Sequence, residues 1–355
     1  MLDRIEWTVQ HIEPGYFPML ADNATGEWKT HRNPKWTGGF WVGMLWMAYE
    51  KTGQEKYLEW ARAWNDSILG YEHEGNHDRG FVYFYSSVYA YKLTKNPSYL
   101  NSALQAARQL VEMFQSSGGI IPQNLKDKEN VIIDTMMNLQ LLWWTHFNAN
   151  ENDPLKNSCP EIALLHAQTT LTDFIREDGS TWQSVHYDSS TGKIIKKHTH
   201  QGYSDSSCWS RGQSWGFYGF LKAYEATGND VFLDAAKALG EYIIVHLPDD
   251  GVPWYDYDDP GKYKDTSAGA IAASAFLQLS KTVTDPNARI IYYEFGKQMV
   301  ANLIKGHLTP FIEPESLVGI LRNGCYQIYK NADSETIWGD YYLMEALAAL
   351  IFERE

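Results

Sequence analysis

The chain has 355 residues and a formal net charge of −14 at pH 7, and hydrophobic residues make up 44% of it. This charge argues against a nucleic-acid partner, because neutralising phosphates requires clustered Lys and Arg and the sequence has no basic stripe. It also has no run of about 18 apolar residues to span a bilayer. We expect a globular protein with a sizeable core and no membrane partner.

Cysteine usage indicates the compartment. Cys159, Cys208 and Cys325 are widely spaced and match neither a disulfide framework nor a zinc pattern. The first twelve residues have neither the basic n-region nor the apolar h-region of a signal peptide. We therefore expect a cytoplasmic protein.

Aromatic residues are abundant, with 14 Trp and 23 Tyr. Aromatic rings beyond the needs of a core serve as stacking platforms, and the C–H faces of sugars pack well on them. The alternative is that a large helical protein fills its interior with aromatic side chains.

Along the chain, three segments are similar to one another, residues 47–61, 89–103 and 222–236. Each has Ala-Tyr, then Thr followed by Gly or Lys, then an aromatic-Leu pair, then Ala three residues on. The Thr-Gly positions predict the end of one helix, and the aromatic-Leu pair begins another. The repeated unit is therefore predicted to be a helical hairpin.

Weaker copies fill the rest of the chain and bring the candidate inner helices to six. Residues 3–12 supply the remaining outer helix. Helices that are apolar on all sides are buried, so the pattern predicts an all-α (α/α)6 barrel, with residues 1–355 forming a single catalytic domain. An open α-solenoid is the alternative, and it requires capping repeats that we do not identify.

Polar stretches precede the predicted inner helices, and all lie at one end of the barrel if these helices run parallel. The stretches are residues 33–41, 73–83, 132–138, 198–215, 264–270 and 336–342. Loops on a rigid scaffold commonly carry binding and catalysis. Asp265 is predicted to be only a helix cap.

Two aspartates in these stretches are candidates for catalysis. Asp134 lies inside the apolar run 131–144, and Asp78 lies three residues before the start of the apolar run 81–85. Two carboxylates facing one cavity have their pKa values pushed apart by desolvation and like charge. We predict that Asp134, in the more apolar setting, holds a proton and acts as a general acid. The alternative is that both aspartates cap helices.

The long stretch 198–215 predicts a binding loop. Arg211 is the cation best suited to hold a substrate carboxylate, because its guanidinium presents a fixed fork of donors. Five tryptophans are predicted at the mouth, about half of them in contact with a ligand and the rest in the core: Trp36, Trp41, Trp209, Trp215 and Trp338.

Cofactor signals are weak. His73 and His77 have a metal-ligand spacing, but they lie in a predicted loop and no third ligand is indicated. Residues 211–216 lack the context of a dinucleotide fingerprint, and no nucleophile elbow is present. We expect no metal and no cofactor.

Several motifs in order along the chain resemble the unsaturated glucuronyl hydrolases of bacteria (glycoside hydrolase family 88). They are WTGGFWVGMLW at 36–46, NHDRGFVY at 76–83, IIDTMMNL at 132–139, THQGYSDSSCWSRGQSWGFYGF at 199–220 and IWGDYYLMEA at 337–346. The resemblance spans about Trp36 to Ala346 and implies an (α/α)6 barrel.

The resemblance implies hydration of a sugar alkene. Polysaccharide lyases leave a C4=C5 double bond in the terminal uronate, and enzymes of this family protonate C4 and add water at C5. The resulting hemiketal collapses and releases the rest of the chain. Carried over by position, Asp134 is the general acid/base and Asp78 is the second essential aspartate, which binds hydroxyls and stays charged.

The resemblance also implies a set of substrate-binding residues. They are Trp36, Gln183, His200, Gln201, Trp209, Arg211, Trp215, Lys330 and Trp338. Some members have histidine in place of Gln183, for which His186 is a nearby substitute. Of the Ser-x-x-Ser-x-Lys pattern of members acting on sulfated fragments, residues 325–330 keep only Lys330.

The expected substrate is therefore an unsaturated uronate-containing oligosaccharide, glycosaminoglycan-type disaccharides above all. Four alternatives remain: an unsaturated rhamnogalacturonyl hydrolase; an inverting glycosidase with carboxylates roughly 6.5–9.5 Å apart; an epimerase, which requires paired histidines; and a non-catalytic sugar-binding protein. A monomer or homodimer is expected.

Overall fold

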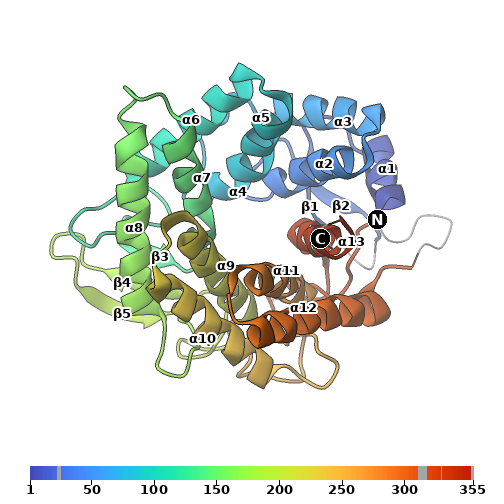
Figure 1. Cartoon of the computed structure of the whole chain (residues 1–355). Helices are drawn as coiled ribbons and strands as arrows, with labels where there is room; N and C mark the ends of the chain where they lie inside the picture. Colours follow the sequence, from blue (N-terminus) through green and yellow to red (C-terminus); the bar gives the residue numbers. More distant parts are fainter. Residues whose placement is uncertain (22–24, 311–317, 329, 353–355) are drawn as a thin grey trace.

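Helical hairpins follow one another around a closed ring, which Figure 1 shows along its axis. The computed structural model describes residues 1–21, 25–310, 318–328 and 330–352. Each inner helix contacts the next, and the last one packs against the first. The ring is therefore closed, which confirms the (α/α)6 barrel and excludes the open solenoid.

The outer helices each bury one stripe of side chains. They are α1 (Leu2–His11), α3 (Glu55–Asp66), α6 (Pro97–Met113), α8 (Leu155–Phe174), α10 (Asp230–His246) and α12 (Pro286–His307). In α6, Tyr99, Ala103, Ala106 and Leu110 are buried. This spacing of three or four residues places them on one face of the helix. Helix α1 is the outer helix predicted at residues 3–12.

The inner helices are buried on nearly all sides. They are α2 (Gly38–Thr52), α4 (Arg79–Tyr83) continued by η1 (Phe84–Val88) and α5 (Tyr89–Thr94), α7 (Thr135–Asn148), α9 (Ser210–Thr227), α11 (Thr266–Thr282) and α13 (Ile337–Phe352). The second inner helix contains a π-helical turn, a local irregularity that often occurs near functional sites. Its sequence pattern did not predict this turn.

The ends of the repeated hairpins follow the predicted chemistry. Gly53 ends α2 with φ +66°, and Gly228 ends α9 with φ +65°, both in the left-handed region that favours glycine. Lys95 takes the same place after α5 with φ +56°. The next helix begins two residues after each of these positions, so the predicted helix ends are confirmed.

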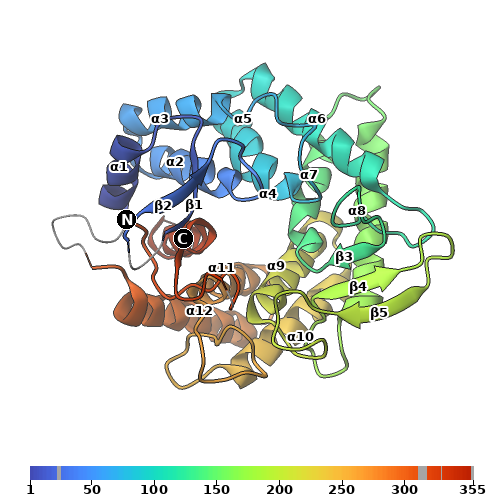
Figure 2. The same cartoon turned by 180° about the vertical axis from the view of Figure 1, so that it is seen from behind.

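Two small antiparallel sheets lie on the face that Figure 2 turns toward the viewer. In one, the strand order is β2 (Trp28–His31), β1 (Phe17–Ala21) and β6 (Glu335–Thr336). In the other, it is β3 (Asn130–Ile132), β4 (Ser184–Tyr187) and β5 (Ile194–His198). The all-α expectation missed these strands because each is at most five residues long. Strands β3 and β6 lead into α7 and α13, so the sheets mark the end where inner helices begin.

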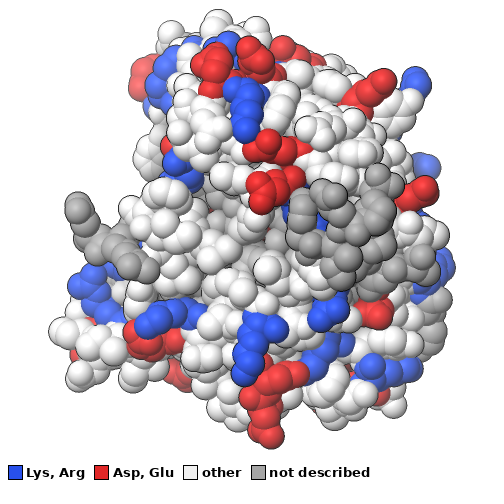
Figure 3. Space-filling model, turned by 90° about the vertical axis from the view of Figure 1, so that its right-hand side faces the viewer, with Lys and Arg blue, Asp and Glu red and all other residues white. Residues whose placement is uncertain are grey.

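The surface is mixed in charge. On the face drawn in Figure 3, acidic and basic side chains are interspersed, and the described residues there form no continuous basic patch. Within the described ranges, no helix combines the length and apolar character needed to cross a bilayer.

Candidate active site

Asp78 and Asp134 stand at the first turns of two inner helices. Asp78 is the N-cap residue of α4 and Asp134 that of α7, yet neither side chain accepts a capping hydrogen bond. By contrast, the Asp265 carboxylate accepts the backbone N–H groups of Ser267 and Ala268 at the start of α11. A capping role therefore explains Asp265 but neither of the two predicted catalytic aspartates.

The two helix starts are held together by Asn138. Its Nδ2 donates to the Asp134 carbonyl oxygen at 3.1 Å, and its Oδ1 accepts the Phe81 backbone N–H at 2.7 Å. A Cβ atom on Gly80 would lie 2.3 Å from Asn138 Cα, so only glycine permits this approach of α4 to α7. The same contact brings the loops carrying Asp78 and Asp134 together.

Asp134 has the electrostatics of an acid that retains its proton. Burial raises its pKa to about 7, the charge of Asp78 acts in the same direction, and the Arg211 charge opposes both. Its Oδ1 is buried and has no hydrogen-bond partner among the described residues. An ionised carboxylate without donors is costly in such a place, so the neutral form is favoured.

Asp78 is also shifted, but it has compensating partners. Burial raises its pKa to about 7, while hydrogen bonds from Asn76 and Asn138 and the charge of Arg79 favour the ionised form. The side chain keeps 13% of its surface exposed. The two carboxyl groups titrate as a pair. The sequence predicted a raised pKa at Asp134 only, because the loop around Asp78 is polar in sequence and its desolvation arises from the fold.

His77 lies behind the pair. Its Nε2 is 3.3 Å from Asp78 Oδ1, and its Nδ1 is 2.6 Å from the hydroxyl of Thr135, the residue after Asp134. The ring is completely buried, and this burial lowers its pKa to about 3, so the imidazole is neutral. Our sequence reasoning weighed His77 only as a metal ligand. Its position next to Asp78 was the signal that pointed to the site.

Arg211 is held rigidly beside these groups. Its guanidinium binds the Asp265 carboxylate, the Cys325 carbonyl oxygen at 2.8 Å and the Tyr326 carbonyl oxygen at 3.1 Å. The prediction that Asp265 is only a cap is therefore wrong, because one of its oxygens caps α11 while the other pairs with Arg211. The binding of a substrate carboxylate by Arg211 stays a prediction.

The guanidinium of Arg211 also lies between indole rings. Its Cζ is 4.6 Å from the Trp209 ring centroid and 5.4 Å from that of Trp338. Both indole N–H groups are buried without a protein partner in the described residues. Buried donors without a partner are rare in folded proteins, so these two N–H groups mark a place for a further hydrogen-bond acceptor.

Gln183 organises the predicted binding loop. Its Oε1 accepts the backbone N–H groups of His200 at 2.9 Å and Gln201 at 3.0 Å, together with the Thr199 hydroxyl. Its Nε2 donates to Gln201 Oε1 at 2.8 Å. The fold thus brings Gln183, His200 and Gln201 together. The His186 Nε2 lies 3.3 Å from a carboxylate oxygen of Glu129, and its substitution for a histidine at position 183 stays a prediction.

The five tryptophans predicted near the mouth of the barrel differ in how deeply they are buried. Trp36 is half-buried, and its ring centroid is 4.7 Å from Trp338 and 6.0 Å from Tyr326. Trp215 is buried beneath Phe81, at a centroid distance of 4.9 Å. Trp215 is therefore part of the core, as expected for some of the five tryptophans.

Trp41 does not reach the mouth. It packs against Trp64 of the outer helix α3, with ring centroids 5.8 Å apart, so it is one of the five tryptophans expected to belong to the core. Trp41 lies inside α2, whereas Trp36 precedes the first residue of that helix, so the two rings do not share a helix face. Tyr326 also lies near the two carboxyl groups, although the sequence did not predict it as a site residue. Burial raises the pKa of its phenol, and the charges of Asp78 and Asp134 raise it further.

Lys330 is exposed in a turn whose backbone N–H donates to the Gln327 carbonyl oxygen at 3.1 Å. Its substrate contact stays a prediction. Among the described residues, no group of three or more His, Cys, Asp and Glu is placed to hold a metal ion.

A desolvated carboxyl pair, a fixed arginine, amide groups and aromatic rings meet at one end of an (α/α)6 barrel, as expected of a glycoside hydrolase. The model of Glycosyl Hydrolase Family 88 matches residues 16–346, and the chain belongs to this family.

Known relatives cover nearly the whole chain. An unsaturated glucuronyl hydrolase of Bacillus sp. (strain GL1) is 33% identical over 94% of this chain and 90% of its own. An unsaturated chondroitin disaccharide hydrolase of Streptococcus pyogenes serotype M1 is 33% identical over 93% and 84%. A solved structure described as UGL with dGlcA-Glc-Rha-Glc superposes with a TM-score of 0.92 at 31% identity, covering 99% of this chain and 95% of the other.

Proposed function

We propose that the protein releases the 4,5-unsaturated uronic acid from the non-reducing end of lyase-generated oligosaccharides, with Asp134 as the general acid/base. The main support for this proposal is the buried Asp134 carboxyl group, which has one oxygen without a hydrogen-bond partner and a pKa raised to about 7. The names of the relatives support unsaturated glucuronides as substrates rather than the rhamnogalacturonyl alternative.

The reaction uses one proton and one water. Asp134 transfers its proton to C4 of the alkene while water adds at C5, and the Asp134 carboxylate then takes a proton from that water. The hemiketal opens to a ketone at C5, which frees the ring oxygen and leaves C1 as a hemiacetal. That hemiacetal expels the second sugar. A carboxyl group with a pKa near the working pH suits both proton transfers.

The surrounding residues bind and orient the substrate in this proposal. Asp78 accepts sugar hydroxyls at its exposed edge, and neutral His77 supports it from behind. Trp36 offers a half-buried face for ring stacking, and the Trp209 and Trp338 indoles offer unused donors. Arg211 faces the substrate carboxylate from its fixed place.

Alkene absorbance tests the reaction. We expect the ultraviolet absorbance of the conjugated double bond to disappear when the enzyme acts on unsaturated chondroitin or hyaluronan disaccharides. Unsaturated pectin disaccharides test the rhamnogalacturonyl alternative. Bond cleavage with the absorbance intact would rule out hydration and indicate a conventional inverting glycosidase.

We also propose a domain organisation, a cellular compartment and an oligomeric state for the protein. We place residues 1–355 in one catalytic domain, since α13 packs against both α2 and α11. The free, buried cysteines support a reducing, cytoplasmic setting. We propose a monomer or homodimer, and light scattering measures which of the two forms.

A further inference from the structure

A second cavity lies at the opposite end of the barrel from the catalytic pair. Its volume is about 640 Å³, and side chains of α2, η1, α5, α7, α9, α11 and α13 line it. Its lining residues include Lys51 and Thr282 in the last turns of α2 and α11. Asp78 and Asp134 stand where α4 and α7 begin. The two sites therefore open at different ends of the same ring.

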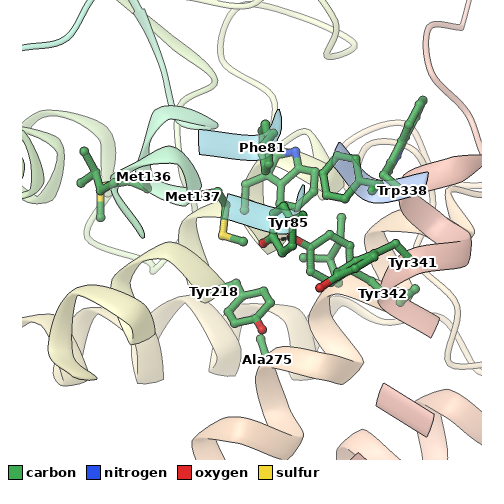
Figure 4. Packing of buried hydrophobic residues seen from close by; sticks show 14 of the residues in the cluster. Phe81, Tyr85, Met136, Met137, Tyr218, Ala275, Trp338, Tyr341 and Tyr342 are labelled. Carbon is green, nitrogen blue, oxygen red and sulfur yellow. Dashed lines mark hydrogen bonds between the residues drawn. The ribbon is translucent and has the colours of Figure 1, made fainter. Parts of the chain in front are cut away.

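An aromatic layer separates the two ends. Trp215 packs between Phe81 and Tyr342, with centroid distances of 4.9 and 5.4 Å. The Tyr342 and Tyr85 hydroxyls are 2.6 Å apart, and Figure 4 shows Phe81, Tyr85, Tyr341 and Tyr342 packed together. This layer closes the barrel between the catalytic mouth and the second cavity.

The inner part of the cavity carries groups that bind hydroxyls. The Glu345 carboxylate accepts hydrogen bonds from Tyr218 at 2.8 Å and Tyr341 at 3.3 Å. The amide Nε2 of Gln278 lies 3.4 Å from the same carboxylate. The Ser274 hydroxyl also donates to the oxygen that Tyr218 contacts. Among the described residues, the other Glu345 oxygen accepts only the Tyr341 hydroxyl, and it retains capacity for a bound hydroxyl.

Cations surround this polar patch. Lys92 of α5, Lys222 of α9 and Lys281 of α11 all line the cavity. Burial lowers the pKa of Lys92, the charge of Lys222 lowers it further, and the charge of Glu50 raises it. Lys222, in the interior of α9, pairs with Glu225 at 2.7 Å, and Glu50 and Glu225 line the same cavity. Lys92 has no ion-pair partner among the described residues. An anion beside Lys92 would supply this ammonium group with a counter-charge.

Aromatic faces complete the lining. Phe84 and Tyr89 belong to the cavity wall, and the Lys92 ammonium lies 5.5 Å from the Phe84 ring centroid. Rings next to charged and amide groups match the alternating apolar and polar faces of a sugar.

We propose that this cavity is a second, non-catalytic binding site for a small anionic sugar, either a sugar acid or a sugar phosphate. The anionic group lies between Lys92 and Lys222, the hydroxyls reach Glu345 and Gln278, and the ring face packs on Phe84. The cavity volume of about 640 Å³ is that of an ordinary small-ligand site.

Calorimetric titration tests the site with four probes: D-glucuronate, glucose 6-phosphate, glucose and inorganic phosphate. We expect glucuronate or glucose 6-phosphate to bind the wild type, with whichever binds tighter identifying the anionic group. Glucose binding as tightly would overturn the role of the lysines. Inorganic phosphate binding as tightly would indicate an adventitious ion only, and binding by none of the probes would overturn the proposal.

Three variants locate the binding. Lys92→Gln is expected to weaken the affinity about tenfold or more, the value of a charge-assisted hydrogen bond. Ala349→Phe, which fills part of the cavity, is expected to abolish binding without removing a charge. Lys297→Gln makes the same charge change on outer helix α12, where Lys297 pairs with Glu294 at 2.9 Å, and is expected to bind normally. Unchanged affinity in both cavity variants would show that the ligand occupies the catalytic mouth instead.

Discussion

Gly80 of α4 lies directly against the backbone of Asn138 in α7, so close that a Cβ atom would stand 2.3 Å from Asn138 Cα and 2.5 Å from its carbonyl oxygen. Each helix begins at one of the two aspartates proposed to be catalytic, and this contact sets their starts side by side. The glycine is therefore required by the geometry of the site, although its own φ is not in the left-handed region.

Gly80→Ala is expected to force α4 and α7 apart. Overpacking of this kind costs about 1–3 kcal/mol, and the displacement of Asp78 from Asp134 lowers kcat. Urea denaturation and initial rates measure the two effects. Gly306→Ala is the matched control, because a Cβ there meets nothing within 4 Å and alanine favours the helix. A Gly80→Ala enzyme with normal stability and kcat would show that the contact has no role.

Asp134→Asn is expected to abolish turnover while sparing substrate binding. The amide keeps the shape of the carboxyl group but has no proton to transfer to carbon. Loss of alkene absorbance measures turnover, and calorimetry with an unsaturated disaccharide measures binding. Asp234→Asn, at the exposed residue that pairs with Lys237 on α10, controls for the loss of charge. Near-normal turnover by Asp134→Asn would refute the assignment of the acid.

The rate of the reaction is expected to fall as pH rises through about 7. Burial raises the pKa values of Asp134 and Asp78 to about 7 each, so the proton needed at C4 is lost above that pH. The apparent value belongs to the coupled pair. A profile of kcat/KM from pH 4 to pH 9 measures it. An alkaline limb near pH 4, the ordinary range of aspartate, would contradict the desolvation of the pair.

The free energy of unfolding is also expected to depend on the protonation of Asp134. An unfolded aspartate has a pKa of about 3.9, while that of Asp134 is raised to about 7, so the folded state binds the proton more tightly. The contribution of Asp134 to stability is fully present below about pH 4 and is lost as pH rises to about 7, by up to about 4 kcal/mol.

The Asp134→Asn variant tests this sign. Its stability relative to wild type is expected to improve between pH 4.5 and pH 8, because the amide carries no charge to bury. Urea unfolding at both pH values measures the difference. A relative stability independent of pH would show that Asp134 titrates normally in the folded protein.

The Asp265→Asn substitution is expected to remove the buried ion pair with Arg211 and to keep the helix cap. Asparagine caps helices as well as aspartate, but the change leaves the Arg211 charge buried without its counter-charge. Breaking such a pair costs about 3–5 kcal/mol. Asp285→Asn makes the same change at the cap of α12, which accepts the Ala288 N–H at 2.8 Å, and is expected to stay within about 0.5 kcal/mol. Equal urea midpoints for the two variants would show that the ion pair adds nothing.

Local chemistry made the architecture predictable. The helix ends at Gly53 and Gly228 follow from residues adjacent in sequence, and the apolar inner helices follow from periodicity. The strands β3 to β5 were missed because short pairings between distant segments leave little trace in any one of them.

The sequence by itself determined the barrel and singled out Asp134, since one acid in an apolar run is visible without coordinates. Only the tertiary structure decided the rest of the site. It desolvated Asp78, placed His77 and Tyr326 beside the carboxyl pair, and turned Trp41 into the core. Burial and charge coupling depend on segments far apart in the chain, so these properties exist only once the ring has closed.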